Sequence, residues 1–484
     1  MTLTIIIIYL ALVLFVGSMS NRLFRRTGED YFVASRTIGP FFLLMSLFGT
    51  NMTAFAILGG SGKAYHEGIG VFALMPSISA IVIPAVFFFV GTRVWALGKK
   101  HGYLTQIAFV RDRWGSDLVG LLLFIVVVLL LIPYLLIGVM GGGGALNRIT
   151  DGQVPEWVGG ALVTAVVFAY VCFGGLRGTA WANAFQTLVF MILGGVTVYV
   201  IVNKMGGLQD ALGKVSEKYL VREGNFQPLH LLTYTFIPLS VGMFPHMFMH
   251  WLTAEKASTF KRPLMLYPVC IAAVWIPSVL LGVLGTVDFG GLKGPQSNYV
   301  LIQMINQYTP GVLAGLLCAG VFAAIMSSLD SQALSIGSMF TNDIVKHYRR
   351  GEMDDQQQVM MGRIFLAAVL GATFILAQFT PRSIFGLGVW CFSGFSALFP
   401  VVIAALFWKR STKYGAFASI FTVILFWIVL FFYQGGKEYT FFESGVMPVT
   451  AMFAASALAM IVGSLVTQPP SEERLARFFP AEKE

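Results

Sequence analysis

Thirteen long apolar segments dominate the sequence and limit what the chain can fold into. They lie near residues 3–19, 40–64, 70–92, 118–144, 157–173, 181–203, 230–252, 264–287, 310–337, 362–379, 385–408, 414–433 and 446–466. Of the 484 residues, 57% are hydrophobic and 11% are charged, which is typical of a membrane protein. A membrane β-barrel needs strands of alternating polarity, and "LLLFIVVVLLLIP" does not alternate. We therefore predict an all-α polytopic membrane protein with 13 transmembrane helices.

The positions of the basic residues predict the orientation of these helices. Lys and Arg are retained on the cytoplasmic side during insertion. With the N-terminus outside, the inner loops hold 23 of the 32 Lys and Arg residues, which leaves 32 − 23 = 9 for the outer loops. The sequence thus favours an outer N-terminus and an inner C-terminus. The formal net charge of +9 then comes mostly from the basic residues of the inner loops. We expect these residues to contact membrane lipids rather than nucleic acid.

The rest of the chain adds no soluble domain to this prediction. We expect a single transmembrane domain over residues 1–467, followed by a cytoplasmic tail at 468–484. The first apolar segment lacks preceding basic residues, so we interpret it as a retained helix rather than a signal peptide. The four cysteines are scattered singly through apolar segments without metal-ligand spacing, and we expect them to be core residues.

Two of the predicted helices contain residues that interrupt a helix. The second reads "SLFGTNMTAFAILGGSGKAY", with polar residues at its middle and a cluster of glycines behind them. The seventh reads "FIPLSVGMFPHMF" and contains two prolines and a glycine. Interrupted segments at corresponding positions of two halves indicate an inverted-repeat transporter with its site at mid-membrane. We therefore predict five-helix repeats over 40–203 and 230–408, flanked by helices 1, 12 and 13.

The ninth apolar segment carries the polar residues that are hardest to explain in a membrane. "AAIMSSLDSQ" places Ser327, Ser328 and Asp330 in mid-span. A sodium ion that loses its water needs about five or six oxygen ligands, which hydroxyls and the carbonyls of an interrupted helix can provide. The sequence therefore predicts a cation site between the ninth helix and the break in the second.

These segments together resemble the sodium:solute symporter family. The resemblance covers nearly the whole chain, through "DYFVASRTIG", "GTNMTA", "FGGLRGTAWANAFQ", "FPHMFMHWLTAEKA", "GVFAAIMSSLDSQALSIGSMFTNDI" and "LFWKRSTKYGA". It implies the five-plus-five fold also found in the leucine transporter. It also implies that Gly49, Met52, Ala324, Ser327 and Ser328 form the sodium site shared by the family.

One departure from the family pattern points to a second cation site. Many members begin helix 6 with Trp-x-Asp, and that aspartate binds a second sodium together with hydroxyls of helix 9. Here the motif reads Trp181-Ala182-Asn183, while the matching helix 9 hydroxyl position is Asp330, followed by Ser331. We expect a second cation site, or a proton-titratable substitute, between Asn183, Ser327, Asp330 and Ser331. The alternative is that Asp330 faces water or pairs with a basic residue such as Arg177.

The solute pocket is expected where the two breaks face one another. Members that carry sugars use a Gln and an acid at the positions of Ala56 and Met75, so a sugar is disfavoured. The candidate lining is apolar and aromatic and suits a small organic anion or an amino acid, whose carboxylate could meet a helix N-terminus. It comprises Thr50, Asn51, Thr53, Phe55, Ala56, Met75, Phe244, His246, Trp390 and Phe392.

The sequence therefore predicts a sodium-coupled symporter of a small organic solute in the plasma (inner) membrane, with no organic cofactor. His246 and His250 have the spacing of a zinc pair but no HExxH pattern and no third ligand, so sodium is the only metal expected. We interpret His250 as a residue of the cytoplasmic gate. A proton-coupled symporter of the same fold and a non-transporting sensor derived from it remain alternatives. No catalytic constellation is present that would favour an enzyme. The sequence leaves the oligomeric state open.

Overall fold

The computed structural model describes residues 2–19, 36–221, 226–349, 354–380 and 383–479. These ranges are helical and contain no β-strand, only an isolated bridge between Ile38 and Ala254. The longer helices of the first half are α1 (Thr2–Met19), α3 (Pro40–Asn51), α4 (Gly60–Glu67), α6 (Pro76–Val86), α7 (Thr92–His101), α8 (Gln106–Trp114), α9 (Asp117–Ile149) and α10 (Glu156–Lys204). Those of the second half are α12 (Pro228–Tyr234), α13 (Pro245–Leu252), α14 (Lys261–Asp288), α15 (Val300–Tyr308), α16 (Gly311–Met339), α18 (Asp355–Ala377), α19 (Ile384–Ala397), α20 (Phe399–Phe407), α21 (Lys413–Tyr433), α22 (Pro448–Leu465) and α23 (Glu472–Phe478).

The predicted all-helical membrane architecture is confirmed. Among the described residues, nine helical runs are long and apolar enough to cross a membrane, and a bent pair of helices makes a tenth. Three shorter apolar helices, over 2–17, 40–51 and 156–172, coincide with the remaining predicted segments. Each of the 13 apolar segments therefore lies on helical structure. That all 13 cross the membrane, with the N-terminus outside, stays a prediction.

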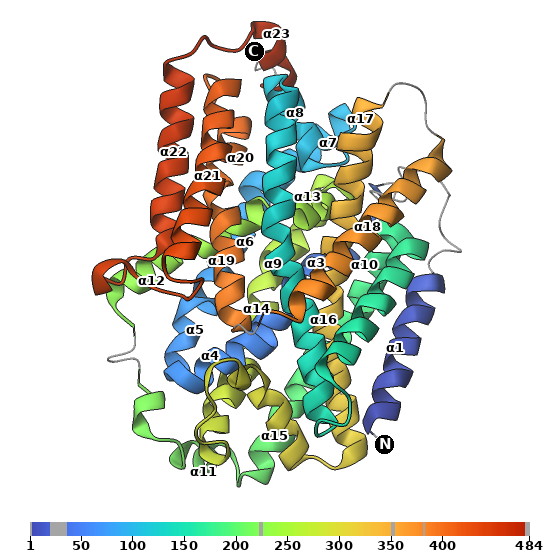
Figure 1. Ribbon diagram of the computed structural model, residues 1–484, viewed down its shortest axis with the longest axis vertical. Helices are drawn as coiled ribbons and strands as arrows, with labels where there is room; N and C mark the ends of the chain where they lie inside the picture. Colours follow the sequence, from blue (N-terminus) through green and yellow to red (C-terminus); the bar gives the residue numbers. More distant parts are fainter. Residues whose placement is uncertain (1, 20–35, 222–225, 350–353, 381–382, 480–484) are drawn as a thin grey trace.

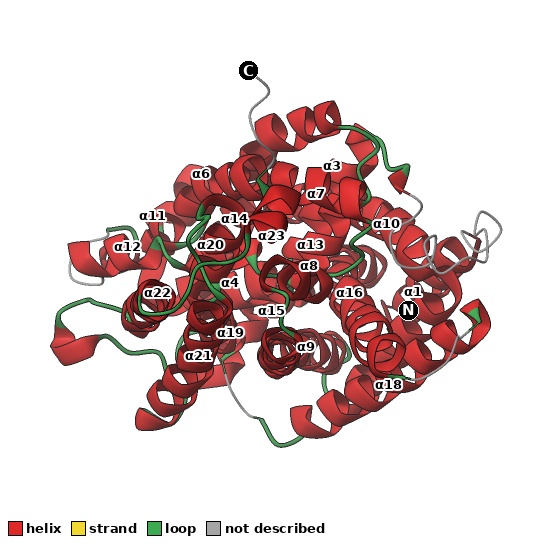
Figure 2. Cartoon of the chain, turned by 90° about the horizontal axis from the view of Figure 1, so that it is seen from above, coloured by secondary structure: helices red, strands yellow, loops and turns green. Residues whose placement is uncertain are grey.

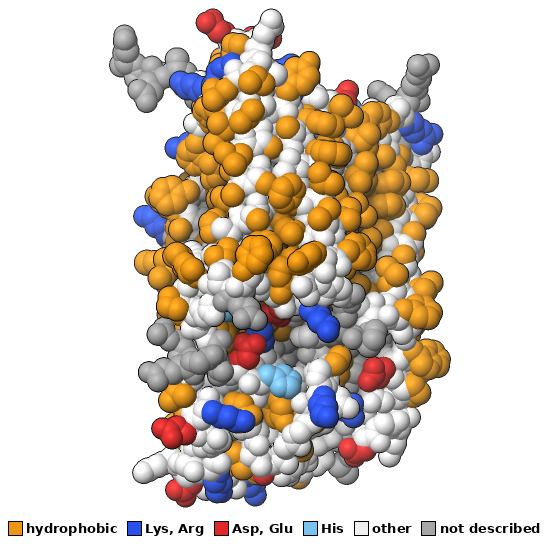
Figure 3. Space-filling view, turned by 60° about the vertical axis from the view of Figure 1, so that its left-hand side comes forward, with side chains coloured by type: hydrophobic (Ala, Val, Ile, Leu, Met, Phe, Trp, Pro, Cys, Tyr) orange, Lys and Arg blue, Asp and Glu red, His pale blue; other side chains and the backbone are white. Residues whose placement is uncertain are grey.

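The helices lie side by side along the long axis of the molecule, with the two termini at opposite ends (Figure 1). Viewed along this axis, α16 lies among the other helices while α18 and α21 lie at the periphery (Figure 2). The burial of their apolar windows agrees, at 83% for the α16 span against 22% for α18 and 28% for α21. A broad hydrophobic belt covers the molecule above a more polar end (Figure 3). The polar sequence of α16 is thus at the centre of the protein.

Both predicted helix breaks are present. In the second predicted helix, the first part is α3, which ends at Asn51. The next residue, Met52, has an extended backbone with φ −89° and ψ 95°. The chain resumes at Phe55 in a π-helical turn, η3 (Phe55–Gly59), that leads into α4. In the seventh, α12 passes into a 3-10 segment, η7 (Ile237–Gly242), and then bends by 52° into α13, which begins at Pro245. Proline at the first helical position explains where α13 starts, because it has no N–H to leave unpaired.

Candidate functional site

The first site forms where the end of α3 meets the middle of α16. The Ser327 Oγ donates a hydrogen bond to the Gly49 carbonyl at 2.9 Å, and it also lies 3.1 Å from the Ala324 carbonyl of its own helix. Ser327 and Ala324 are fully buried. The Gly49 carbonyl is close to the end of α3, where carbonyls lack partners further along the helix. A hydroxyl on one broken repeat thus meets a carbonyl on the other.

Ser328 and Met52 complete the predicted set around this contact. The Ser328 hydroxyl donates to the Ile325 carbonyl at 3.2 Å, within its own helix, and is also buried. Met52 is 4% exposed and occupies the extended backbone of the break. The two serine hydroxyls and the Gly49 and Ala324 carbonyls are hard oxygens of the kind that bind sodium.

Three residues of the predicted second site, Asn183, Asp330 and Ser331, form one hydrogen-bonded network, whereas Ser327 bonds to the Gly49 carbonyl instead. Asn183 Nδ2 donates to the Ser331 Oγ at 2.8 Å, and Ser331 donates to Asp330 Oδ1 at 3.0 Å. The other carboxylate oxygen, Oδ2, accepts from the Tyr170 hydroxyl at 2.8 Å. Asn183 and Asp330 are 0% exposed. A buried carboxylate is costly, and two donors offset part of that cost. The Arg177 side chain, the alternative partner of Asp330, lies outside the described residues.

His250 joins this network to α3. Its Nε2 lies 3.2 Å from the Ser331 Oγ, and its Nδ1 lies 2.8 Å from the Ser46 Oγ. Because Ser331 uses its only proton toward Asp330, His250 must donate through Nε2 and accept from Ser46 through Nδ1. The chain from Ser46 to Asp330 therefore has a single direction of donation. It ties α3, α13, α16 and the second half of α10 together.

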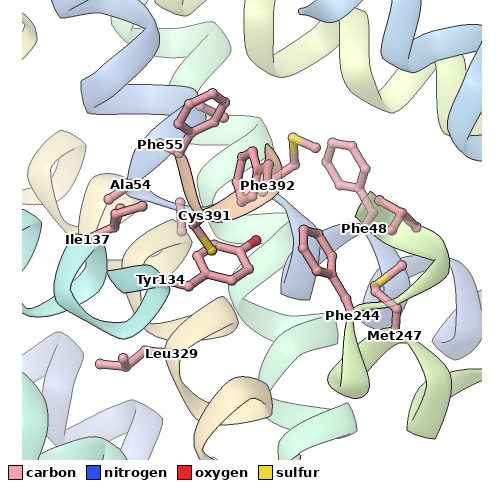
Figure 4. Packing of buried hydrophobic residues seen from close by; sticks show 14 of the residues in the cluster. Phe48, Ala54, Phe55, Tyr134, Ile137, Phe244, Met247, Leu329, Cys391 and Phe392 are labelled. Atoms are coloured by element: carbon pink, nitrogen blue, oxygen red, sulfur yellow. The ribbon is translucent and has the colours of Figure 1, made fainter. Parts of the chain in front are cut away.

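Four residues of the predicted solute pocket meet in an aromatic cluster between the two breaks. Phe55 packs edge-on against Phe392 with ring centroids 4.9 Å apart, and Phe392 lies 5.5 Å from Phe244. Tyr134 of α9 lies against both Phe244 and Phe392, at 5.3 and 5.0 Å (Figure 4). His246 stacks on Phe244 at 5.0 Å. The cluster is apolar and buried, as the sequence predicts for the pocket.

Other residues of the predicted pocket hold the broken helix in place or face elsewhere. Asn51 donates to the Tyr267 hydroxyl at 2.8 Å, and the Thr53 hydroxyl accepts from the Phe55 N–H at 2.8 Å. The Ala56 carbonyl accepts from a serine hydroxyl of α14 at 2.7 Å. Trp390 lies apart from the aromatic cluster and donates to the Lys437 carbonyl at 3.1 Å. The last predicted residue, Met75, precedes α6.

Some buried polar atoms at this centre have no hydrogen-bond partner in the described part of the chain. They include both ring nitrogens of His246, the Thr50 hydroxyl and the amide oxygen of Asn183. A buried polar group without a partner costs about 1–3 kcal/mol. Such a cost is expected where a bound solute or ion supplies the missing contacts. No group of three His, Cys, Asp or Glu side chains suited to a transition metal occurs among the described residues.

Sequence reasoning did not assign Tyr134 and Tyr170 to either site, and it placed His250 at a gate rather than in the network. Both tyrosines belong to long apolar helices, α9 and α10, in which a single Tyr is ordinary. Only the packing of three helices brings Tyr170 to Asp330. The pairing of His250 with Ser331 likewise joins residues 81 positions apart. No single segment of the sequence contains a signal that would predict these contacts.

Comparison with known proteins accounts for this arrangement. The sequence matches the Sodium:solute symporter family over residues 31–422. The chain belongs to this family. The high-affinity proline transporter PutP of Bacillus subtilis (strain 168) is 26% identical over 93% of this chain and 95% of its own length. The sodium/pantothenate symporter of Escherichia coli (strain K12) is 24% identical over 91% of each chain. These relatives are transporters, and the chain is not an enzyme.

Solved structures of transporters share the fold of this symporter family member. A sodium-coupled sialic acid symporter, in a substrate-bound outward-open state, superposes with a TM-score of 0.80 at 17% identity, covering 97% of this chain and 99% of that one. Mhp1, a nucleobase-cation-symport-1 family transporter, gives 0.62 at 14% identity over 93% and 97%. MhsT gives 0.51 at 13% identity, covering 89% and 98%. The likeness establishes a leucine-transporter-like fold.

Proposed function

We propose that the protein is a sodium-coupled symporter of a small organic solute in the plasma (inner) membrane. The observation that carries this proposal is the 2.9 Å contact between the Ser327 hydroxyl and the Gly49 carbonyl at the break. A sodium ion bound there would break this hydrogen bond and move the two oxygens apart, and the Ser327 hydroxyl would keep its proton. The ion would be held by lone pairs of the Ser327 hydroxyl and by the Gly49 carbonyl, with Ser328 and the carbonyls of Met52 and Ala324 as further ligands. The family and its sodium-coupled members support sodium as the coupling ion.

Coupling follows from the elements that this ion would join. Gly49 belongs to the broken helix of the first repeat, and Ser327 to α16 of the second. The Phe55 ring of the aromatic cluster follows the same break six residues after Gly49. An ion that fixes the break therefore also fixes one side of the pocket. Cation and solute would then each raise the affinity for the other, as linkage requires.

We also propose a second cation site at Asn183, Asp330 and Ser331. The unpartnered amide oxygen of Asn183 and the buried Asp330 carboxylate support it. Tyr170 and Ser331 both donate to this carboxylate. An ion would have to displace one of these donors, so we expect this site to be weaker than the first. An Asp330→Asn variant with unchanged cation dependence would remove the proposal.

For the solute we propose a small organic anion or amino acid rather than a sugar. The aromatic cluster offers much apolar surface, and the unpartnered polar atoms of Thr50 and His246 are the few groups that could orient a solute. The relatives named above transport proline and pantothenate. Both solutes carry a carboxylate. A sugar would need more hydrogen-bonding groups than this cluster presents.

The first experiment needs no solute. Purified protein is heated in increasing NaCl, with choline chloride at equal ionic strength as the control, for the wild type, Ser327→Ala, Ser328→Ala and Ser335→Ala. A ligand that binds only the folded state raises the melting temperature by mass action. Ser335 is the matched control, because it is also buried on α16 but donates only to the Gln332 carbonyl of its own helix.

We expect a sodium-specific rise in melting temperature in the wild type and in Ser335→Ala, and its loss in Ser327→Ala and Ser328→Ala. Equal responses to sodium and choline would contradict the proposal. If acidic pH stabilises the protein where sodium does not, proton coupling becomes the better account. If neither cation has an effect, a sensor that no longer transports is favoured.

A further inference from the structure

A cavity of about 270 Å³ lies beside the second half of the broken helix, in the half of the molecule that carries the N-terminus (Figure 1). Its wall combines charged and aromatic side chains from four separate parts of the chain. The lining includes Lys63 and Glu67 of α4, His230 of α12, Trp390 of α19, and Glu438 and Tyr439 of the segment between α21 and α22. Figure 3 shows acidic, basic and histidine side chains gathered around a hollow below the hydrophobic belt.

An ion cluster stands in the wall of this cavity. The Lys63 ammonium lies 2.9 Å from Glu438 Oε2 and 2.7 Å from Glu67 Oε1. The side chains of Lys63 and Glu438 are 15% and 20% exposed, so the pair is shielded from solvent yet open to the cavity. The link from Lys63 to Glu438 joins residues 375 positions apart. This ion pair holds the segment between α21 and α22 against α4 of the first repeat.

The ion cluster lies close to the aromatic cluster. The Lys63 ammonium lies 5.4 Å from the centroid of the Phe385 ring. Phe385 stacks on Phe55 at 4.6 Å, and Phe55 packs against Phe392 of the cluster. The Phe385 ring therefore lies between the Lys63 ammonium and the Phe55 ring of the proposed solute pocket. A solute arriving through this cavity would meet charges first and aromatic rings next.

We propose that this cavity is an outer binding site for a zwitterionic solute, whose carboxylate binds Lys63 while its ammonium group binds Glu438. The inference rests on the proposed symport function and narrows its solute to the amino acid or betaine class. When the solute binds, its carboxylate replaces Glu438 as the partner of Lys63, and its ammonium group replaces Lys63 as the partner of Glu438. The Lys63–Glu438 ion pair across the cavity therefore breaks. Trp390 and Tyr439 add ring faces that attract an ammonium group.

The charge balance favours a zwitterion over an anion or a neutral solute. One lysine faces two glutamates, so the cluster carries a net charge of 1 − 2 = −1. A zwitterion has no net charge, so the net charge of the site stays at −1. Lys63 and Glu438, which separate when it binds, each gain a new partner of opposite charge. A monoanion would take Lys63 from Glu438 and leave that carboxylate uncompensated, while a neutral sugar could replace neither charge. Uncompensated charges in a partly buried cavity are costly.

The test measures stabilisation of the purified protein by defined probes in saturating NaCl. The probes are the twenty amino acids and glycine betaine, together with the methyl ester and the deaminated acid of any zwitterion that stabilises the wild type. We expect at least one zwitterion to stabilise the protein, and its ester and acid to bind at least tenfold more weakly. In Lys63→Gln and Glu438→Gln, the affinity for that zwitterion should fall at least tenfold.

Lys437→Gln is the matched control, because it makes the same change at an exposed lysine next to Glu438 and should keep wild-type affinity. Stabilisation by NaCl alone should be equal in all four proteins, which separates this proposal from the sodium site. Loss of the sodium response in the wild type would instead count against the symport function. The outer site is wrong if no zwitterion stabilises the wild type, if the deaminated acid binds as tightly, or if both charge variants keep full affinity.

Discussion

At the scale of single residues, the proposed sodium site depends on how closely Gly49 approaches the second half of α10. A Cβ at this position would lie 2.2 Å from the Thr187 Oγ1 and 3.2 Å from the Asn183 carbonyl. The Thr187 hydroxyl already donates to the Met45 carbonyl at 3.0 Å, so it cannot move without losing that bond. Glycine is therefore required here by contact rather than by backbone conformation.

We expect Gly49→Ala to lower the free energy of unfolding by about 1–3 kcal/mol, the usual cost of overpacking. Because the added methyl group pushes α3 away from α10, the sodium-specific rise in melting temperature should also shrink. Gly371→Ala is the control, since a Cβ there meets no atom within 4 Å. Thermal unfolding of both variants with and without NaCl provides the measurement. A Gly49→Ala protein as stable and as sodium-responsive as Gly371→Ala would contradict the close approach.

At the scale of the elements, the sequence predicts the breaks well and the contacts between helices poorly. Glycine, proline and threonine residues at 49–62 and 238–245 interrupt the helix to which they belong. Each break can therefore be predicted from a single segment of the sequence. The direction in which a side chain points depends on neighbouring helices. Helix α19 is apolar on all sides, and its sequence cannot show that Phe392 faces the cluster while Trp390 faces the outer cavity.

The short tail helix α23 is a further element that the apolar pattern does not reveal. Arg474 donates to the Trp114 carbonyl of α8 at 2.6 Å, and Arg477 pairs with Asp112 at 3.0 Å. The Phe478 ring is 6% exposed and lies 5.7 Å from the Arg113 guanidinium. Burial, with the nearby charge of Arg474, lowers the pKa of Arg113 to about 10, so Arg113 stays charged at neutral pH.

Truncation after Thr467 should therefore destabilise the protein and expose α8. The loss of the buried Phe478 side chain alone should cost about 1.5–3 kcal/mol. Limited trypsin digestion should then cut near Arg111 and Arg113 sooner than in the full chain. Truncation after Phe479 removes only residues outside the described ranges and is the control. Equal digestion of the two truncated proteins would show that α23 does not protect α8.

At the scale of the whole molecule, the predicted orientation decides which end of the fold faces the cytoplasm. The termini lie at opposite ends, as an odd number of spans requires (Figure 1). With the N-terminus outside, the segment between α21 and α22 is external and the one between α20 and α21 is internal. Lys437 and Lys409 are exposed lysines on these two segments. The four native cysteines are buried, so a cysteine introduced at either lysine can be labelled selectively.

In intact cells, a membrane-impermeant maleimide should label Lys437→Cys at once and Lys409→Cys only after the membrane is permeabilised. This pattern would place the ion cluster of Lys63 and Glu438 on the outer face, where a solute driven inward by sodium must arrive first. The reverse labelling pattern would show that the orientation is opposite to the predicted one. The same cavity would then face the cytoplasm, where the solute leaves the protein. The proposal for the sodium site would be unaffected, because it rests on the contact between α3 and α16 and not on the orientation of the molecule.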